Sequence, residues 1–78
     1  MAEQPIRAAR QAEVLAIVRR YGSIFGMASW QVAERLEWAA NGRTVAPYLI
    51  QLEKDGKLQR ILDMGQRCWR ARGLLTDG

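Results

Sequence analysis

The sequence predicts an α+β fold in which three helices precede a C-terminal β-hairpin of two or three strands. Apolar residues recur at helical spacing in three segments, which are closed by Gly22, the Asn41-Gly42 pair and Gly56. The pattern after Gly56 is extended, with Gly65 as a turn residue. A chain of 78 residues is the size of one small domain. We therefore predict a single domain over 1–78, with a core over about 6–72 and a tail over 73–78.

The first predicted helix begins near Pro5 and ends at Gly22. Proline is tolerated in the first turn of a helix, and glycine is common just past the last one. Leu15 and Val18 belong to a broad apolar face with helical spacing. The arginines of this segment lie mostly off that face, and we interpret them as solvated: Arg7, Arg10, Arg19 and Arg20.

The second predicted helix spans Ser29–Leu36, with Ser29 as its N-cap. The preceding segment, 23–28, is too short for a helix. We predict a loop there, with a strand of one to three residues near Met27 that adds a third strand to the hairpin. Trp30 and Trp38 flank this helix and are expected to close the core at its two ends.

The third predicted helix presents Val45, Leu49 and Leu52 as one stripe toward the core. Proline inside a helix costs about 3 kcal/mol but little in the first turn. This favours a helix that begins near Thr44, with Thr44 as N-cap and Pro47 at the third helical position.

One residue of this helix does not fit the stripe. Ile50 falls outside it, so two interpretations stay open. Either Ile50 packs on the first helix, or it is exposed and marks an interface.

The predicted hairpin pairs Lys57–Leu62 with Gln66–Ala71 around the turn Asp63-Met64-Gly65. Trp69 is expected to point into the core. Leu58 and Ile61 have opposite parity in the outgoing strand, which predicts a bulge or a shorter strand.

The composition argues against an enzyme and favours a polyanionic partner. Histidine is absent and Cys68 is the single cysteine, so His-based catalysis, an internal disulfide and zinc sites of His or several Cys are excluded. We expect no catalytic residue, metal or cofactor. The net charge of +4 favours nucleic acid as that partner.

No segment approaches the roughly 20 apolar residues that span a bilayer, and no secretory leader is recognised. A cytoplasmic protein without membrane contact is therefore expected, in a bacterial cytoplasm or nucleoid.

The order of these elements resembles the winged helix-turn-helix superfamily over about residues 6–72. No subfamily is identified, although the small size resembles compact regulators of phages and mobile elements. The residues that carry the resemblance are Ser29-x-x-Val32-Ala33-x-x-Leu36, Arg43-Thr44-Val45-x-x-Tyr48-Leu49-x-x-Leu52-x-x-x-Gly56-Lys57-Leu58 and Arg67-Cys68-Trp69.

The resemblance implies a regulator of double-stranded DNA whose third helix enters the major groove and whose wing touches the backbone. Arg43 is then expected to fork onto guanine and Gln51 to pair with adenine. Arg60 and Arg67 on the wing are expected to bind phosphate, Arg67 from the wing base. The full set of expected DNA-binding residues is Arg43, Thr44, Pro47, Tyr48, Gln51, Lys54, Arg60 and Arg67.

An alternative function follows from the weak charge of the third helix. Glu53 and Asp55 close it, and the span from Ser29 to Gly56 is near neutral or slightly acidic. Winged helices also serve as protein-interaction modules, so an adaptor or inhibitor of a host protein complex stays open, with Tyr48 and Ile50 as its contact residues. The sequence also leaves open whether the domain is a homodimer.

Overall fold

The computed structural model describes residues 3–22 and 25–72, which form three helices and one antiparallel hairpin. This α+β element order agrees with the prediction. The predicted tail at 73–78 and the first two residues of the predicted loop, 23–24, lie outside the described residues. The elements are α1 (Glu3–Tyr21), α2 (Ser29–Ala33), α3 (Gly42–Lys54), β1 (Leu58–Asp63) and β2 (Gln66–Ala71).

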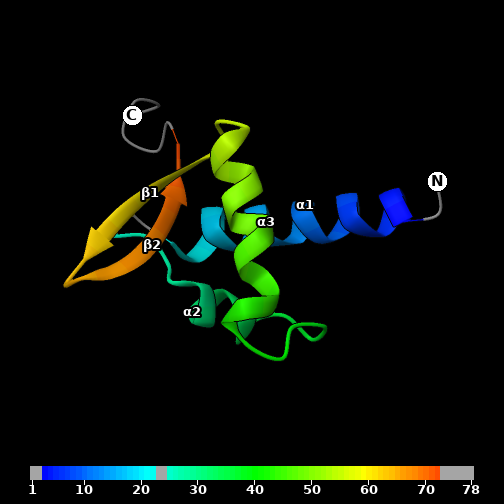
Figure 1. Ribbon diagram of the computed structural model, residues 1–78, viewed down its shortest axis with the longest axis horizontal. Helices are drawn as coiled ribbons and strands as arrows, with labels where there is room; N and C mark the ends of the chain where they lie inside the picture. Colours follow the sequence, from blue (N-terminus) through cyan, green and yellow to red (C-terminus); the bar gives the residue numbers. More distant parts are fainter. Residues whose placement is uncertain (1–2, 23–24, 73–78) are drawn as a thin grey trace.

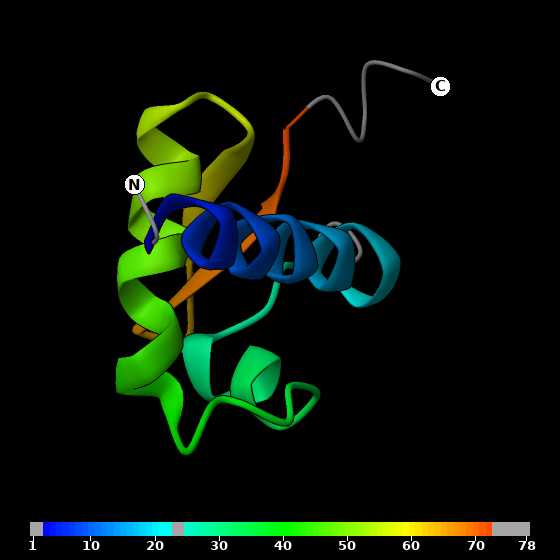
Figure 2. The same cartoon turned by 90° about the vertical axis from the view of Figure 1, so that its right-hand side faces the viewer.

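Helix α3 forms one side of the molecule. Figure 1 shows α3 crossing in front of α1, with α2 below and the hairpin to one side. In Figure 2 α3 lies at the left and α1 extends to the right of it, and the tip of the hairpin reaches to the same side of the molecule as α3. Helix α3 and the hairpin tip therefore share one face, which α1 does not cover.

The core is built around the predicted stripe of α3. Val45 and Leu49 are fully buried, and Leu52 is 4% exposed. Helix α1 and the hairpin both pack against α3. Buried residues that complete the cluster are Val14, Leu15, Val18, Met27, Val32, Ala33, Leu36, Leu58 and Trp69.

A single residue, Met27, adds to the hairpin beside β2. The N–H of Met27 donates to the Trp69 carbonyl and the N–H of Trp69 donates to the Met27 carbonyl, both at 2.8 Å. Gly26 makes this approach feasible, because its φ is +77° and a Cβ there would lie 2.9 Å from the Trp69 carbonyl oxygen. The predicted short strand near Met27 is therefore confirmed as a one-residue bridge.

The hairpin pairs without a bulge. Leu58 lies opposite Ala71 and Ile61 opposite Cys68, so Leu58 and Ile61 point to opposite faces of a regular ladder. The predicted bulge is wrong, and β1 extends to Asp63 rather than ending at Leu62. Met64 and Gly65 both have positive φ, 55° and 82°, which is typical of a tight two-residue hairpin turn.

Helix α2 begins and ends differently from the prediction. Ala28 is the N-cap and Ser29 the first helical residue, so Ser29 is not the cap. The N–H of Ala28 donates to the side-chain oxygen of Gln31 at 2.8 Å, which satisfies it without a hydroxyl cap. The helix stops at Ala33, and Leu36 reaches the core from the turn that follows.

The tryptophans divide into buried and exposed. Trp69 is 4% exposed, as predicted, whereas Trp30 is 48% exposed and does not close the core. Trp38 is partly buried. Its ring is stacked by the Arg10 guanidinium at 4.7 Å, and its N–H donates to Glu13 at 3.3 Å. Trp38 thus ties the loop before α3 to α1.

Helix α3 begins two residues before the predicted cap. Asn41 is the N-cap, and its Oδ1 accepts from the N–H of Arg43 at 3.0 Å and of Thr44 at 3.3 Å. The prediction of Thr44 as cap is therefore wrong. Pro47 consequently lies in the second turn, where it has no N–H to donate to the carbonyl four residues earlier.

Replacing Asn41 with alanine removes this cap. We expect the free energy of unfolding to fall by about 0.5–2 kcal/mol, because the Arg43 N–H loses its acceptor and the Thr44 N–H keeps only the Asn41 carbonyl. Urea titration followed by tryptophan fluorescence measures the change. The control is Asn41→Asp, which keeps an acceptor oxygen and should stay near the wild type. A loss in the aspartate variant as large as in the alanine variant would show that the cap is not the cause.

Candidate nucleic-acid interface

The outer face of α3, opposite the core stripe, is the first part of the candidate interface. Successive residues are about 100° apart around a helix, so positions 43, 47, 50, 51 and 54 fall on one side. All five side chains are exposed, and Ile50 is 39% exposed. This answers the question that the sequence left open, since Ile50 points outward. The residues of this outer face are Arg43, Pro47, Ile50, Gln51 and Lys54.

Tyr48 does not belong to the outer face. It is about 140° from Arg43 around the helix axis. Its ring lies edge-on to Trp38, with 5.4 Å between the ring centres, and it lines a hollow with residues of α1. The prediction that Tyr48 and Arg43 share a surface is therefore wrong. Thr44 is partly buried at the edge of the face.

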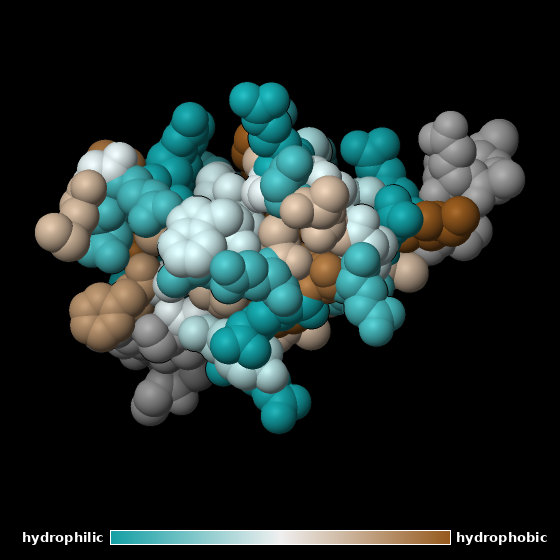
Figure 3. Space-filling model, turned by 90° about the horizontal axis from the view of Figure 1, so that it is seen from below, coloured by the Kyte–Doolittle hydropathy of each residue, from teal (hydrophilic) through white to brown (hydrophobic). Residues whose placement is uncertain are grey.

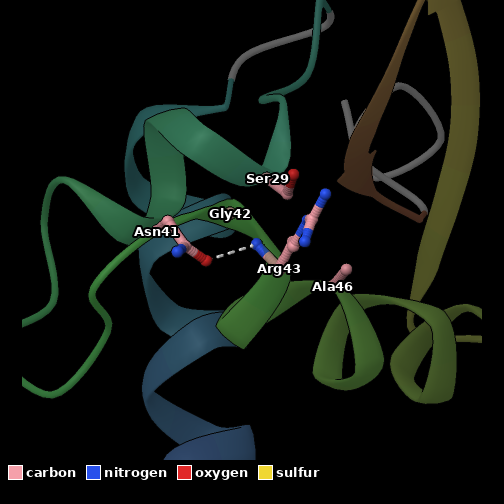
Figure 4. A pocket seen from close by; sticks show the side chains of 5 residues that line it. All are labelled: Ser29, Asn41, Gly42, Arg43 and Ala46. Atoms are coloured by element: carbon pink, nitrogen blue, oxygen red, sulfur yellow. Dashed lines mark hydrogen bonds between the residues drawn. The ribbon is translucent and has the colours of Figure 1, made fainter.

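The N-terminal end of α3 borders a surface hollow of about 430 Å³. Figure 4 shows the Arg43 side chain extending away from α3 and past Ser29 of α2. Gly42 lets the two helices approach this closely, because a Cβ there would lie 2.7 Å from the Ser29 hydroxyl oxygen. Sequence reasoning treated Ser29 only as a cap, so its place beside Arg43 was missed. A serine at the start of a helix gave no indication of this.

A hydrogen bond at the C-terminal end of α3 orients Gln51, one of the residues expected to read bases. The amide nitrogen of Gln51 donates to Asp55 at 3.0 Å, one turn further along the helix. Asp55 therefore orients the Gln51 side chain, and the second N–H and the oxygen of this amide are not used by this hydrogen bond.

Glu53 joins the hairpin to α3. Its carboxylate accepts from the Trp69 indole N–H at 3.2 Å and lies 3.6 Å from the Arg60 guanidinium. Arg60 and Trp69 are cross-strand partners, so this face of the hairpin looks toward α3. The Arg60 ion pair is partly solvated and contributes little stability, but it places a cation beside the helix.

Arg67 lies near the tip of the hairpin. It is paired with Leu62, one pair away from the turn, and its side chain is exposed. The prediction that Arg67 lies at the base is therefore wrong. The reason is the tight turn, which leaves only the pair Asp63 and Gln66 beyond it.

The exposed cations do not form one unbroken strip. Arg43, Lys54, Arg60 and Arg67 are spread over α3 and the hairpin, and the carboxylates of Glu53 and Asp55 lie among them. Seen from below, hydrophilic and apolar groups are interspersed, with apolar groups near the middle as well as at both ends (Figure 3). No broad apolar patch is seen on this side.

No protein-family model, curated protein or solved structure matches this chain. The candidate interface therefore depends on its own geometry: an outward face of α3, a cation at its N-terminal end and a hairpin beside it.

Cys68 and the acidic side chains are the described groups that bear on nucleophilic chemistry and metal binding. Cys68 is 4% exposed, and its burial, with a smaller effect from the charge of Asp63, raises the pKa of the thiol. The thiol therefore stays protonated at neutral pH and is a poor nucleophile. Within residues 3–22 and 25–72, no group of three or more Cys, Asp or Glu could hold a metal ion. No helix in these ranges is long and apolar enough to cross a membrane.

Proposed function

We propose that this chain is a winged helix-turn-helix protein that binds double-stranded DNA as a regulator, with α3 in the major groove. The observation that carries the proposal is the outer face of α3, whose five side chains are all exposed although the opposite stripe is buried. A major groove about 12 Å wide accepts a helix presented in this way. Helix α2 and its turn support the N-terminal end of α3, and the hairpin, termed the wing from here on, stands beside it.

The side chains of the outer face suit base edges. Arg43 can fork onto guanine O6 and N7, and Gln51 onto adenine N6 and N7. Ile50 is an exposed apolar side chain in the middle of the same face, where the methyl group of thymine is a matching contact. Lys54, Arg60 and Arg67 suit phosphates, which set position rather than sequence.

The proposal is tested by titrating the purified protein with a pool of random-sequence 40-base-pair duplexes at two salt concentrations. Binding is expected to weaken as salt rises, because each phosphate contact releases counterions. Repeated capture and amplification of the bound fraction should enrich one sequence. A sizing column run on the same sample shows whether one or two copies bind. No binding at low salt would contradict the proposal.

Replacing Arg67 with alanine distinguishes the role of the wing in DNA binding from that of α3. We expect weaker binding to all duplexes alike and a salt slope smaller by about one, since one phosphate contact is lost. The enriched sequence should not change. Affinity at several salt concentrations gives the slope, and Arg19→Ala, which removes one arginine from α1, is the control. A changed sequence preference would show that Arg67 reads bases instead.

A protein partner is the second candidate function. Ile50 favours it, because an exposed isoleucine is also a common docking contact, and Trp30 on α2 is similarly exposed. If duplex DNA is not bound, Ile50→Ala should abolish capture of a partner that the wild type retains. Tyr48 is a weaker choice, because Trp38 and the core cover part of its ring.

A further inference from the structure

The tip of the wing carries the two most exposed large apolar side chains among those described. Met64 is 100% exposed and Leu62 is 73% exposed. Single exposed apolar residues are normal on a protein surface. Here two lie together at the end of a projecting hairpin, and Arg67 lies directly across from Leu62. The tip therefore combines apolar contact area with a cation.

The orientation of the wing follows from the strand alternation. Arg60 and Leu62 share a face of β1, and their partners Trp69 and Arg67 share that face of β2. Because Arg60 and Trp69 both contact Glu53 of α3, this face looks toward the helix. Leu62 and Arg67 continue it outward, beyond the end of the contact with α3.

The carboxylate of the tip, that of Asp63, lies on the opposite face of the hairpin from Leu62 and Arg67. Asp63 pairs with Gln66, out of phase with Leu62 and Arg67. A phosphate that approaches the tip between α3 and the wing therefore meets Arg67 before it meets Asp63. Arg60 is paired with Glu53 further down this face, so Arg67 is the cation that the tip offers to a nucleic-acid backbone.

The wing extends beyond Arg60, which contacts Glu53 of α3. Met64 is four residues beyond Arg60, which is about 13 Å along an extended strand. Ladder pairs continue to the turn, and both turn residues have fixed positive φ. The wing is therefore a stiff arm. Its tip lies on the same side of the molecule as α3 (Figure 2).

We propose that Met64 acts as an apolar wedge that enters the minor groove next to the major groove bound by α3, and bends the duplex. Leu62 contacts the sugars, and Arg67 binds a phosphate at the groove edge. This inference rests on the proposed DNA binding and extends it to indirect readout. Apolar side chains inserted at base steps unstack them and kink the duplex, most readily at flexible pyrimidine–purine steps. Specificity then arises at base pairs that α3 does not touch.

The test uses a 40-base-pair duplex enriched from the random pool, with a fluorescence donor and acceptor at its ends. Wild-type protein is expected to raise energy transfer, as a kink of about 20–90° brings the ends together. A 2-aminopurine at the contacted step should brighten as it unstacks. Met64→Ala and Met64→Gln should still bind the duplex but leave the energy transfer near that of the free duplex. Leu62→Ala should give an energy transfer between that of the free duplex and that of the wild-type complex.

Each outcome decides the inference. A bound but straight duplex, or a Met64→Ala variant that bends it as the wild type does, overturns the wedge and leaves the proposed DNA binding intact. Absence of any duplex binding overturns both. Met64 is fully exposed, so its replacement should not disturb folding, which circular dichroism checks. Ile6→Ala is the matched control, because it removes a side chain of α1 that is 58% exposed and apolar, and it should keep the bend.

Discussion

Replacing Leu49 with alanine is expected to lower the free energy of unfolding by about 2–5 kcal/mol. Leu49 is fully buried, at the middle of the apolar stripe by which α3 packs on the core. The substitution removes apolar contact and leaves a cavity that a close-packed core fills only in part. A domain of this size is stable by about 4–12 kcal/mol, so this loss is a large share of the total.

Chemical denaturation followed by tryptophan fluorescence measures this loss, and a thermal melt should show a midpoint lower by at least about 8 °C. Two controls distinguish the effect of losing buried volume from the effect of the Leu→Ala change itself. Leu49→Met keeps the volume and should cost less than about 1.5 kcal/mol. Leu62→Ala makes the same chemical change at a side chain that is 73% exposed, and should stay within about 0.5 kcal/mol of the wild type. Equal effects at Leu49 and Leu62 would contradict the assigned core.

Replacing Arg43 with alanine is expected to weaken binding to the enriched duplex by about 1–3 kcal/mol, or roughly 5- to 150-fold. Arg43 projects from the N-terminal end of α3 past Ser29, where its guanidinium is free to fork onto a guanine (Figure 4). Loss of that fork should relax the preference at one base pair. Competition binding with duplexes changed at single positions measures both effects.

Arg43→Lys distinguishes base reading from charge. Lysine keeps the positive charge but lacks the planar fork, so the salt slope should be kept while the preference at that base pair falls. Arg19→Ala again removes an arginine from α1 and should leave the preference unchanged. An Arg43→Ala variant that weakens all duplexes equally would place Arg43 on phosphate instead.

The sequence was reliable where the pattern repeats over several turns. The stripe of Val45, Leu49 and Leu52 predicted which side of α3 is buried, because a repeat of three or four residues leaves one choice of face. Alternation likewise predicted that Trp69 of the hairpin points inward. Such patterns depend only on the local geometry of a helix or strand, which the sequence contains in full.

The predictions failed where a residue had two local choices of comparable energy. Asn41, Thr44 and Ser29 can all cap a helix, and only the chain path decides which one lies just outside it. In the structure Asn41 is extended, with φ −159° and ψ 179°, and its side chain reaches the two following N–H groups. Ala28 takes the corresponding place before α2, where Gln31 supplies the missing acceptor.

The sequence alone determined the α+β class, the element order and the buried stripe of α3, because periodicity and turn residues act over a few positions. Tertiary structure alone decided which neighbours cover the remaining faces. Trp30 is exposed, Tyr48 packs against Trp38, and Ile50 lies exposed on the outer face of α3. These outcomes depend on where α1 and the hairpin come to rest against α3. Such contacts join residues that are distant in the chain, and no local pattern specifies them.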